Sequence, residues 1–290
     1  MTDSPAAPDW FTKAVFAPCE SRFVDVDGTP IHYLAWNLRD RDKPGLLFTH
    51  GFRAHARWWS FVAPFFLSRF RVVSMDFAGM GDSGARQHYS SETFSRDIRG
   101  VIADAGFERT TLVGHSFGGG RVARVCADYP ELVERAVIID SFFQVPEIGQ
   151  RELPKFEPRP KNIYPTYEAA RARFRLVPEE NAAAPYVLDF IAQHSLKQVP
   201  GGWTWKFDEY FSPRQVDVDP ATTAAMLERI QAPVTLMYGD SSRVVSRQLA
   251  HAVVKHLRFG RGPVAIPQSH HHVMLDQPIA LIAALKAVLY

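Results

Sequence analysis

The sequence predicts an α/β fold, with a mostly parallel twisted sheet covered by helices on both faces, and three observations support this prediction. Short apolar, β-prone runs alternate with helical periodicity from about residue 21 onward. One of these runs, residues 110–113, leads into Gly114-His-Ser116-Phe-Gly118 and then directly into a helical pattern. The alternation stops after Asp140 and resumes at Pro220, which indicates that a separate segment is inserted into the α/β core.

Length and composition allow a large core and exclude several classes of protein. The chain has 290 residues, of which 46% are hydrophobic and 22% charged, as in ordinary globular proteins. Its formal net charge is +2 without a long Lys or Arg run, so neither nucleic acid nor an anionic membrane is expected as a partner. We find no secretory leader and no run of 18 apolar residues, and therefore expect a cytoplasmic location. The two cysteines, Cys19 and Cys126, suggest no disulfide framework.

The first part of the core, residues 1–143, is expected to begin with a hairpin whose turn is Asp27-Gly28, a favoured pair for tight turns. The expected strands cover residues 21–27, 30–36, 45–49, 71–76, 110–113 and 136–139, and the expected helices cover residues 58–67, 91–105 and 118–128. This order is typical of a parallel sheet with crossover helices.

The segment of residues 144–217 is expected to form a helical lid, because it is rich in proline and lacks a convincing buried strand. Helical patterns occur at residues 166–175 and 182–197, and Trp203, Trp205 and Phe207 then alternate as strand residues do. Residues 218–290 restore the core pattern with expected helices at 220–229 and 245–256 and strands at 233–238 and 263–266. The last helix is expected to bury a stripe of Ile279, Ile282, Leu285 and Leu289.

Ser116 is the candidate nucleophile. The strand before it and the helix after it predict a tight turn that lifts its hydroxyl out of the sheet. Gly114 and Gly118 are needed because a Cβ at either position would collide with the strained backbone. The start of the following helix directs unpaired N–H groups toward this point.

Four motifs give the chain its resemblance to the α/β-hydrolase family over nearly its whole length. They are His50-Gly51-Phe52, Asp76-x-x-Gly79-x-Gly81-x-Ser83, Gly114-His-Ser116-Phe-Gly-Gly119 and His271-x-x-x-x-Asp276-Gln277-Pro278. The resemblance implies the α/β-hydrolase fold and a Ser–His–acid catalytic triad that needs neither cofactor nor metal. The Asp76–Ser83 loop is expected to brace the sheet beside the active site.

The catalytic histidine is expected within the run of residues 270–272. In similar proteins it stands five residues before the acidic residue of the last motif, which selects His271. A shift of register by one residue would select His270 or His272 instead. Because the three histidines are adjacent rather than spaced along a helix, they do not suggest a metal site.

The triad acid departs from the family pattern. Similar proteins usually place it three residues after Gly239, where this chain has Ser242, and a serine cannot orient a histidine as a carboxylate does. Asp140, at the end of the strand expected at 136–139, is favoured, because some relatives with a helical lid place the acid there. Asp240 is the alternative, and either residue is also explained as a turn former.

The oxyanion that forms during acyl transfer needs two preorganised N–H donors. One expected donor is the backbone of Phe117, which follows Ser116 at the start of a helix. The resemblance implies that the other is the backbone of Phe52, where Gly51 allows close approach and His50 holds the loop.

The function expected is a cofactor-free serine hydrolase of the esterase type, acting on a small or medium ester, thioester or lactone. The serine at the nucleophile position argues against haloalkane dehalogenases and epoxide hydrolases of similar shape, whose nucleophile is aspartate. One alternative is a carbon–carbon bond hydrolase with a diketone-like substrate, and another is a non-catalytic ligand-binding protein on the same fold. Three lid arginines, Arg171, Arg173 and Arg175, are interpreted as a solvated face, with attraction of an anionic substrate as the other explanation.

Overall fold

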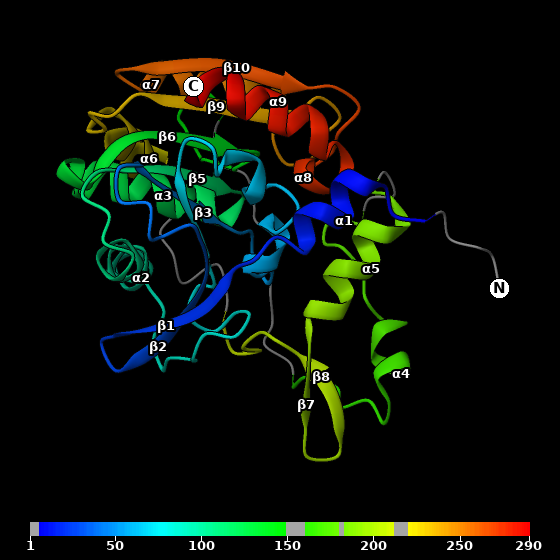
Figure 1. Cartoon of the computed structure of the whole chain (residues 1–290). Helices are drawn as coiled ribbons and strands as arrows, with labels where there is room; N and C mark the ends of the chain where they lie inside the picture. Colours follow the sequence, from blue (N-terminus) through cyan, green and yellow to red (C-terminus); the bar gives the residue numbers. More distant parts are fainter. Residues whose placement is uncertain (1–5, 149–159, 180–182, 212–219) are drawn as a thin grey trace.

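The central feature of the computed structural model is an eight-stranded sheet, in a structure that describes residues 6–148, 160–179, 183–211 and 220–290 (Figure 1). The strand order is β1-β2-β4-β3-β5-β6-β9-β10. The strands are β1 (Glu20–Val26), β2 (Thr29–Trp36), β3 (Gly45–Thr49), β4 (Arg71–Met75), β5 (Thr110–His115), β6 (Val133–Ile139), β9 (Val234–Gly239) and β10 (Gly260–Ile266). In this sheet β2 runs opposite to the other seven strands, and all pairs that do not involve β2 are parallel, so the expected mostly parallel sheet is confirmed.

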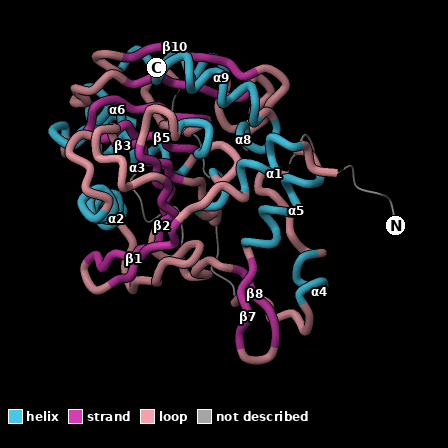
Figure 2. The backbone as a smooth tube through the Cα atoms, viewed as in Figure 1, coloured by secondary structure: helices cyan, strands magenta, loops and turns pink. Residues whose placement is uncertain are grey.

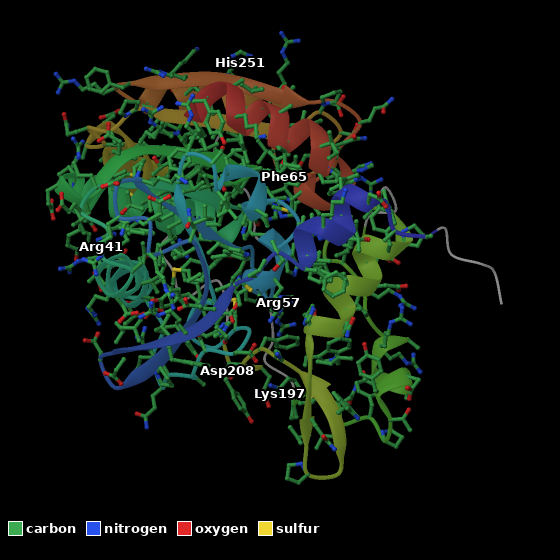
Figure 3. All side chains as sticks on the ribbon, viewed as in Figure 1. Arg41, Arg57, Phe65, Lys197, Asp208 and His251 are labelled. Carbon is green, nitrogen blue, oxygen red and sulfur yellow. The ribbon has the colours of Figure 1, made fainter. Side chains whose placement is uncertain are left out.

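Helices cover both faces of this sheet, because consecutive strand residues point to opposite sides. Leu47 belongs to the apolar cluster beneath α2, α3, α6 and α7, whereas Leu46 and Phe48 belong to the cluster beneath α1, α5, α8 and α9. The helices are α1 (Asp9–Val15), α2 (Ser91–Asp104), α3 (Phe117–Asp128), α4 (Tyr167–Arg171), α5 (Pro185–His194), α6 (Pro220–Glu228), α7 (Arg247–His256), α8 (Val273–Asp276) and α9 (Pro278–Leu289), and the 3₁₀ helices are η1 (Ala56–Trp59), η2 (Ala63–Phe66) and η3 (Pro130–Leu132). Side chains fill the space between these layers (Figure 3).

The part of the chain between β6 and α6 contains α4, α5 and a small antiparallel sheet of β7 (Leu196–Val199) and β8 (Gly202–Trp205). These elements lie together to one side of the large sheet (Figures 1 and 2). The hairpin was not anticipated within a segment expected to be helical, although the alternation of Trp203 and Trp205 pointed to a strand. Positive φ angles of 89° at Gly201 and 144° at Gly202 allow the turn between its strands. Residues 149–159, 180–182 and 212–219 of the expected lid and its border lie outside the described residues, and the limits 144–217 stay a prediction.

Two expectations of local structure were wrong. The helix expected at 58–67 is replaced by η1 and η2, because Pro64, which lacks a backbone N–H, stands in the first turn of the new short helix η2. In α9 the buried residues are Leu281, Ile282, Leu285 and Leu289, whereas Ile279 is 49% exposed. Ile279 stands in the first turn, where the helix starts beyond the edge of the core. No helix in the described ranges combines the length and apolarity that a bilayer crossing requires.

Candidate active site

The turn between β5 and α3 presents Ser116 at the carboxyl end of the sheet. Its backbone has φ 52° and ψ −118°, a conformation that is rare and strained for a residue with a side chain. The Ser116 N–H donates to the carbonyl of Ile139 at the end of β6, at 2.9 Å. This bond places the serine beside the first residue after β6, which is Asp140.

Glycine is required at both flanking positions of this turn. A Cβ at Gly118 would lie 2.6 Å from the carbonyl oxygen of His50, and one at Gly114 would lie 2.7 Å from the Cα of Gly119. Both contacts are with backbone, which cannot rotate away. The turn therefore packs directly against the loop that follows β3.

His271 is the member of the histidine run that contacts Asp140. Its Nδ1 lies 2.8 Å from Asp140 Oδ1, and both side chains are buried. His270 instead contacts Asp276, whose Oδ2 lies 2.7 Å from the His270 backbone nitrogen and 3.2 Å from its Nδ1. His272 packs against Trp58 with 5.5 Å between ring centroids. The three adjacent histidines thus point to three different environments.

The Asp140 carboxylate receives two further hydrogen bonds from the end of β9. The Gly239 N–H donates to Oδ2 and the Ser242 hydroxyl donates to Oδ1, each at 2.8 Å. The Ser242 oxygen itself accepts from the N–H groups of Val244 and Val245 at 3.1 and 3.2 Å, so its single proton is directed to Asp140. The residue at the usual acid position therefore supports a carboxylate on the neighbouring strand.

Asp240, the alternative acid, points to solvent. Its exposed carboxylate accepts a hydrogen bond from the Ser241 hydroxyl at 2.9 Å, and its backbone N–H donates to Ile266. Asp240 stands two residues before Ser242, the usual acid position, and its side chain points away from the His271 ring. Of the two candidate acids, only Asp140 is within hydrogen-bonding distance of His271 Nδ1.

His115 joins the serine turn to the histidine loop, which the sequence analysis did not anticipate. Its buried Nε2–H donates to the carbonyl oxygen of His271 at 2.8 Å, and the two ring centroids are 4.9 Å apart. Burial, assisted by the neighbouring His271 and His272, lowers the pKa of His115 well below its ordinary value, so the ring is neutral. The signal available in the sequence was its place directly before Ser116.

The loop after β3 contains Phe52. Its backbone N–H is expected to hold the oxyanion together with the backbone N–H of Phe117, the first residue of α3. His50 fixes this loop, because its Nε2 accepts from the Phe77 N–H at 3.2 Å and its Nδ1–H donates to the Gly51 carbonyl at 2.7 Å. Burial lowers the pKa of His50, consistent with this neutral form. The rings of Phe52 and Phe117 lie near each other, with 6.3 Å between their centroids.

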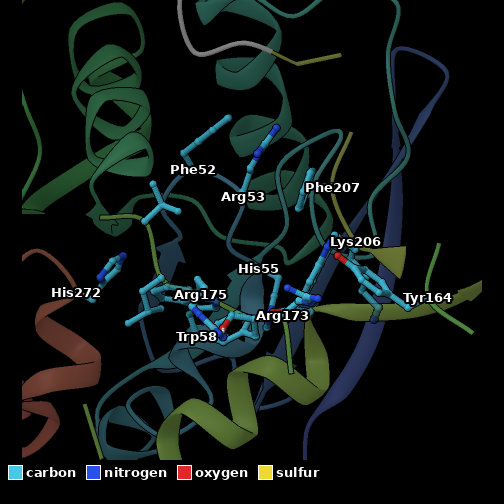
Figure 4. A pocket seen from close by; sticks show the side chains of 15 residues that line it. Phe52, Arg53, His55, Trp58, Tyr164, Arg173, Arg175, Lys206, Phe207 and His272 are labelled. Atoms are coloured by element: carbon cyan, nitrogen blue, oxygen red, sulfur yellow. Dashed lines mark hydrogen bonds between the residues drawn. The ribbon is translucent and has the colours of Figure 1, made fainter. Parts of the chain in front are cut away.

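A cavity of about 300 Å³ lies beside these residues (Figure 4). Its walls include Phe52 and His272, so it adjoins both the loop after β3 and the histidine run. Trp58, Trp205 and Phe207 also line it, whereas Trp203 packs against Tyr167 outside it, at 5.2 Å between ring centroids.

Among the described residues, His32, Asp76 and Asp82 form the group whose donor atoms lie close enough together to suit a metal ion, within 4.8 Å. The Asp76 oxygens already accept from the Ala56 and Asp82 N–H groups and contact His32 Nδ1 at 2.7 Å. Burial alone would raise the pKa of Asp76, but the bond and charge of His32 hold it at about 2. These contacts describe a hydrogen-bonded brace for the loop of residues 76–83.

The chain belongs to the alpha/beta hydrolase family, whose sequence model matches residues 46–285. This finding agrees with the order of strands and with the four motifs that gave the resemblance. The structure is similar to the thioesterase domain from the curacin biosynthetic pathway, with a TM-score of 0.78 and 23% identity over 93% of this chain and 99% of that one. At this identity the likeness concerns the fold.

Two curated relatives differ in the length over which they match. Human epoxide hydrolase 4 is 32% identical over 125 residues, which cover 42% of this chain and about a third (34%) of the human protein. The bifunctional esterase/perhydrolase of Acinetobacter calcoaceticus is 27% identical over 242 residues, covering 77% of this chain and 83% of that enzyme. The activities in the names of these relatives differ, so they do not determine the reaction of this chain.

Proposed function

We propose that this chain is a cofactor-free serine hydrolase that transfers an acyl group to water, with Ser116 as nucleophile, His271 as base and Asp140 as orienting acid. The observation that carries the proposal is the 2.8 Å contact between His271 Nδ1 and the buried Asp140 carboxylate. The bonds of Ser116 to Ile139 and of His115 to His271 support placing the nucleophile beside this pair.

The chemistry follows from the hydrogen bonds of the site. Asp140 accepts a hydrogen bond from His271 Nδ1–H, so the proton stays on Nδ1 and Nε2 is free to accept the Ser116 proton. The serine oxygen then attacks a substrate carbonyl, and the backbone N–H groups of Phe52 and Phe117 stabilise the resulting oxyanion. His271 returns the proton to the leaving group and next deprotonates the water that releases the acid.

The substrate proposed is a small or medium ester, thioester or lactone. The cavity volume of about 300 Å³ and the aromatic walls of Trp58, Trp205 and Phe207 support this size and a partly apolar substrate. We also propose that residues 144–217 act as a lid over the site, since Trp205 and Phe207 come from this segment.

The nucleophile is tested by labelling with a fluorophosphonate, which reacts only with an activated serine. We expect labelling of the intact chain and none of the Ser116→Ala variant, whose hydrolysis of short p-nitrophenyl esters falls by about 10³-fold or more. A dienone substrate assayed in parallel separates ester hydrolysis from carbon–carbon bond hydrolysis. An unlabelled Ser116, in a chain whose melting temperature still rises with added ligands, would instead indicate a binding protein.

A further inference from the structure

We propose that the cavity beside the active site binds an anionic group, a carboxylate or a phosphate, carried by the substrate; this inference rests on the proposed serine hydrolase function and narrows its substrate class. Four cationic side chains line the cavity: Arg53, Arg173, Arg175 and Lys206 (Figure 4). None of the described residues in its wall carries a carboxylate. A cleft lined by charge of one sign concentrates ligands of the opposite sign.

Arg173 and Arg175 have no acidic partner within the described ranges. The side chain of Arg175 donates to the backbone carbonyls of Ala172 and Phe174 at 3.1 and 2.6 Å, which leaves its charge uncompensated. A guanidinium presents paired N–H donors that match the two oxygens of a carboxylate or phosphate. These two arginines therefore provide the charge available to a ligand.

Arg171 provides a contrast within the same segment. It forms an ion pair with Asp189 of α5 and does not line the cavity. The interpretation of all three arginines as a solvated face thus holds for Arg171, but Arg173 and Arg175 contribute to the cavity wall. Arg171 is consequently a matched control for a change of charge at the other two positions.

The remaining two cations are held by neighbours. The guanidinium of Arg53 lies 4.2 Å from the ring centroid of Phe207 and 5.2 Å from that of Phe52. Burial lowers the pKa of Arg53 to about 10, so the side chain keeps its charge at neutral pH. Lys206 bonds to Asp82, outside the cavity wall, at 2.6 Å. These contacts hold both side chains in defined positions at the wall, and Asp82 compensates the charge of Lys206.

The position of the cavity connects this charge to the chemistry. Phe52, whose backbone N–H is a proposed oxyanion donor, and His272, next to the proposed base, both line it. A small molecule whose anionic group is held by the arginines can therefore extend toward Ser116. The fit favours esters with one charged end over esters that are apolar throughout.

The test compares two pairs of esters that differ in charge. Mono-4-nitrophenyl adipate and its methyl ester place the difference in the acyl part, whereas 4-carboxyphenyl butanoate and 4-carbamoylphenyl butanoate place it in the leaving group. We expect kcat/KM to be at least about tenfold higher for the anionic member of one pair. In the Arg173→Ala/Arg175→Ala variant that preference is lost, mainly through a higher KM for the anionic ester. Arg171→Ala leaves all four rates unchanged.

Binding without turnover is measured with adipate and inorganic phosphate, as a rise in melting temperature and as competitive inhibition. We expect either anion to act on the intact chain and not on the double variant, and the stronger one identifies the preferred group. The inference is overturned by equal rates within both pairs, or by anion effects that survive in the double variant. If no ester is hydrolysed and Ser116 stays unlabelled, the proposed function fails, whereas the melting-temperature comparison still decides whether the anion site exists.

Discussion

The carboxyl edge of the sheet and the basic cavity beside it differ in how their charged groups are held. At the edge, Asp140 is completely buried and receives hydrogen bonds from Gly239 and Ser242 besides its contact with His271. In the cavity wall, Arg173 and Arg175 are exposed, and no described carboxylate pairs with them. The buried carboxylate at the edge already has its hydrogen-bonding partners, whereas the arginines of the cavity wall can still pair with an anionic ligand.

From this difference we expect different roles for the two regions, with bond making at the edge and recognition of a substrate in the cavity wall. Groups that take part in bond making are most effective when neighbouring dipoles fix them in advance, since no reorganisation is then needed during the reaction. Groups that recognise a substrate must keep their hydrogen-bonding capacity until it arrives. Changes at the edge should therefore act on kcat, and changes in the cavity wall on KM.

The largest effect is expected from Asp140→Asn. The amide cannot stabilise the His271 imidazolium and favours the wrong tautomer, so kcat for short esters should fall by about 10³- to 10⁴-fold. Asp240→Asn, at the exposed carboxylate, is the matched control and should retain the full rate. Steady-state kinetics of both variants measure the comparison, and a full rate with Asp140→Asn would contradict the assigned acid.

Gly118→Ala is expected to disturb the edge through the backbone. The added Cβ would lie 2.6 Å from the carbonyl oxygen of His50, so the loop that carries Phe52 must move. We expect a loss of about 2–4 kcal/mol in the free energy of unfolding together with lower kcat. Gly120→Ala is the control, because a Cβ there meets nothing within 4 Å and alanine favours a helix. Urea unfolding and ester kinetics of both variants decide the comparison, and equal stabilities would refute the assigned contact.

Lowering the pH should reduce the free energy of unfolding more than it changes the preference of the cavity for anionic esters. Burial lowers the pKa of His55 to about 3 and holds those of His50 and His115 below their ordinary value of 6.5. Below about pH 6.5 the unfolded chain gains protons at His55 and His115 that the folded chain does not, so stability falls by roughly 1 kcal/mol for each pH unit at each of these two residues, and by less at His50. His256 acts in the opposite direction, because Glu147 raises its pKa, but it lies near the surface and contributes less.

Urea unfolding between pH 7 and pH 5 measures this fall in stability. The arginines stay charged over the same range, so the preference of the folded enzyme for anionic esters should persist. A constant free energy of unfolding across this range would show that His55 and His115 do not remain neutral in the folded chain.

Ser242→Ala should have the smallest effect of the series. It removes one of the hydrogen bonds to the Asp140 carboxylate while leaving those from Gly239 and His271, and we expect about a tenfold loss of kcat. Ser241→Ala, which removes a bond to the exposed Asp240, serves as the control. If both variants keep the full rate, the Ser242 hydroxyl does not position the acid.

Much of the fold could be predicted from the sequence, because turn residues and short motifs determine local structure. Asp27-Gly28 predicted its hairpin, and the structure gives these residues the positive φ angles of 53° and 76° that such a turn requires. The candidates Ser116 and His271 followed from short motifs of the same kind. Pro64 is also present in the sequence, and because it lacks a backbone N–H the structure has two short 3₁₀ helices where one helix was expected.

Long-range arrangement explains what the sequence left open. The choice between Asp140 and Asp240 depends on how β6, β9 and β10 align, since that register decides which side chain faces the His271 loop. Likewise, nothing in the spacing of Arg171, Arg173 and Arg175 shows which of them faces a cavity that the loop after β3 helps to build. The limits of the lid and the roles of the site residues stay predictions for the experiments above.

The hydrogen bond between Ser242 and Asp140 has an evolutionary consequence. The Ser242 hydroxyl contacts the same Asp140 oxygen that contacts His271 Nδ1, so the carboxylate could move from one strand end to the other by exchange of two side chains. During evolution the carboxylate that contacts the histidine can thus change its position in the sequence while the fold stays the same.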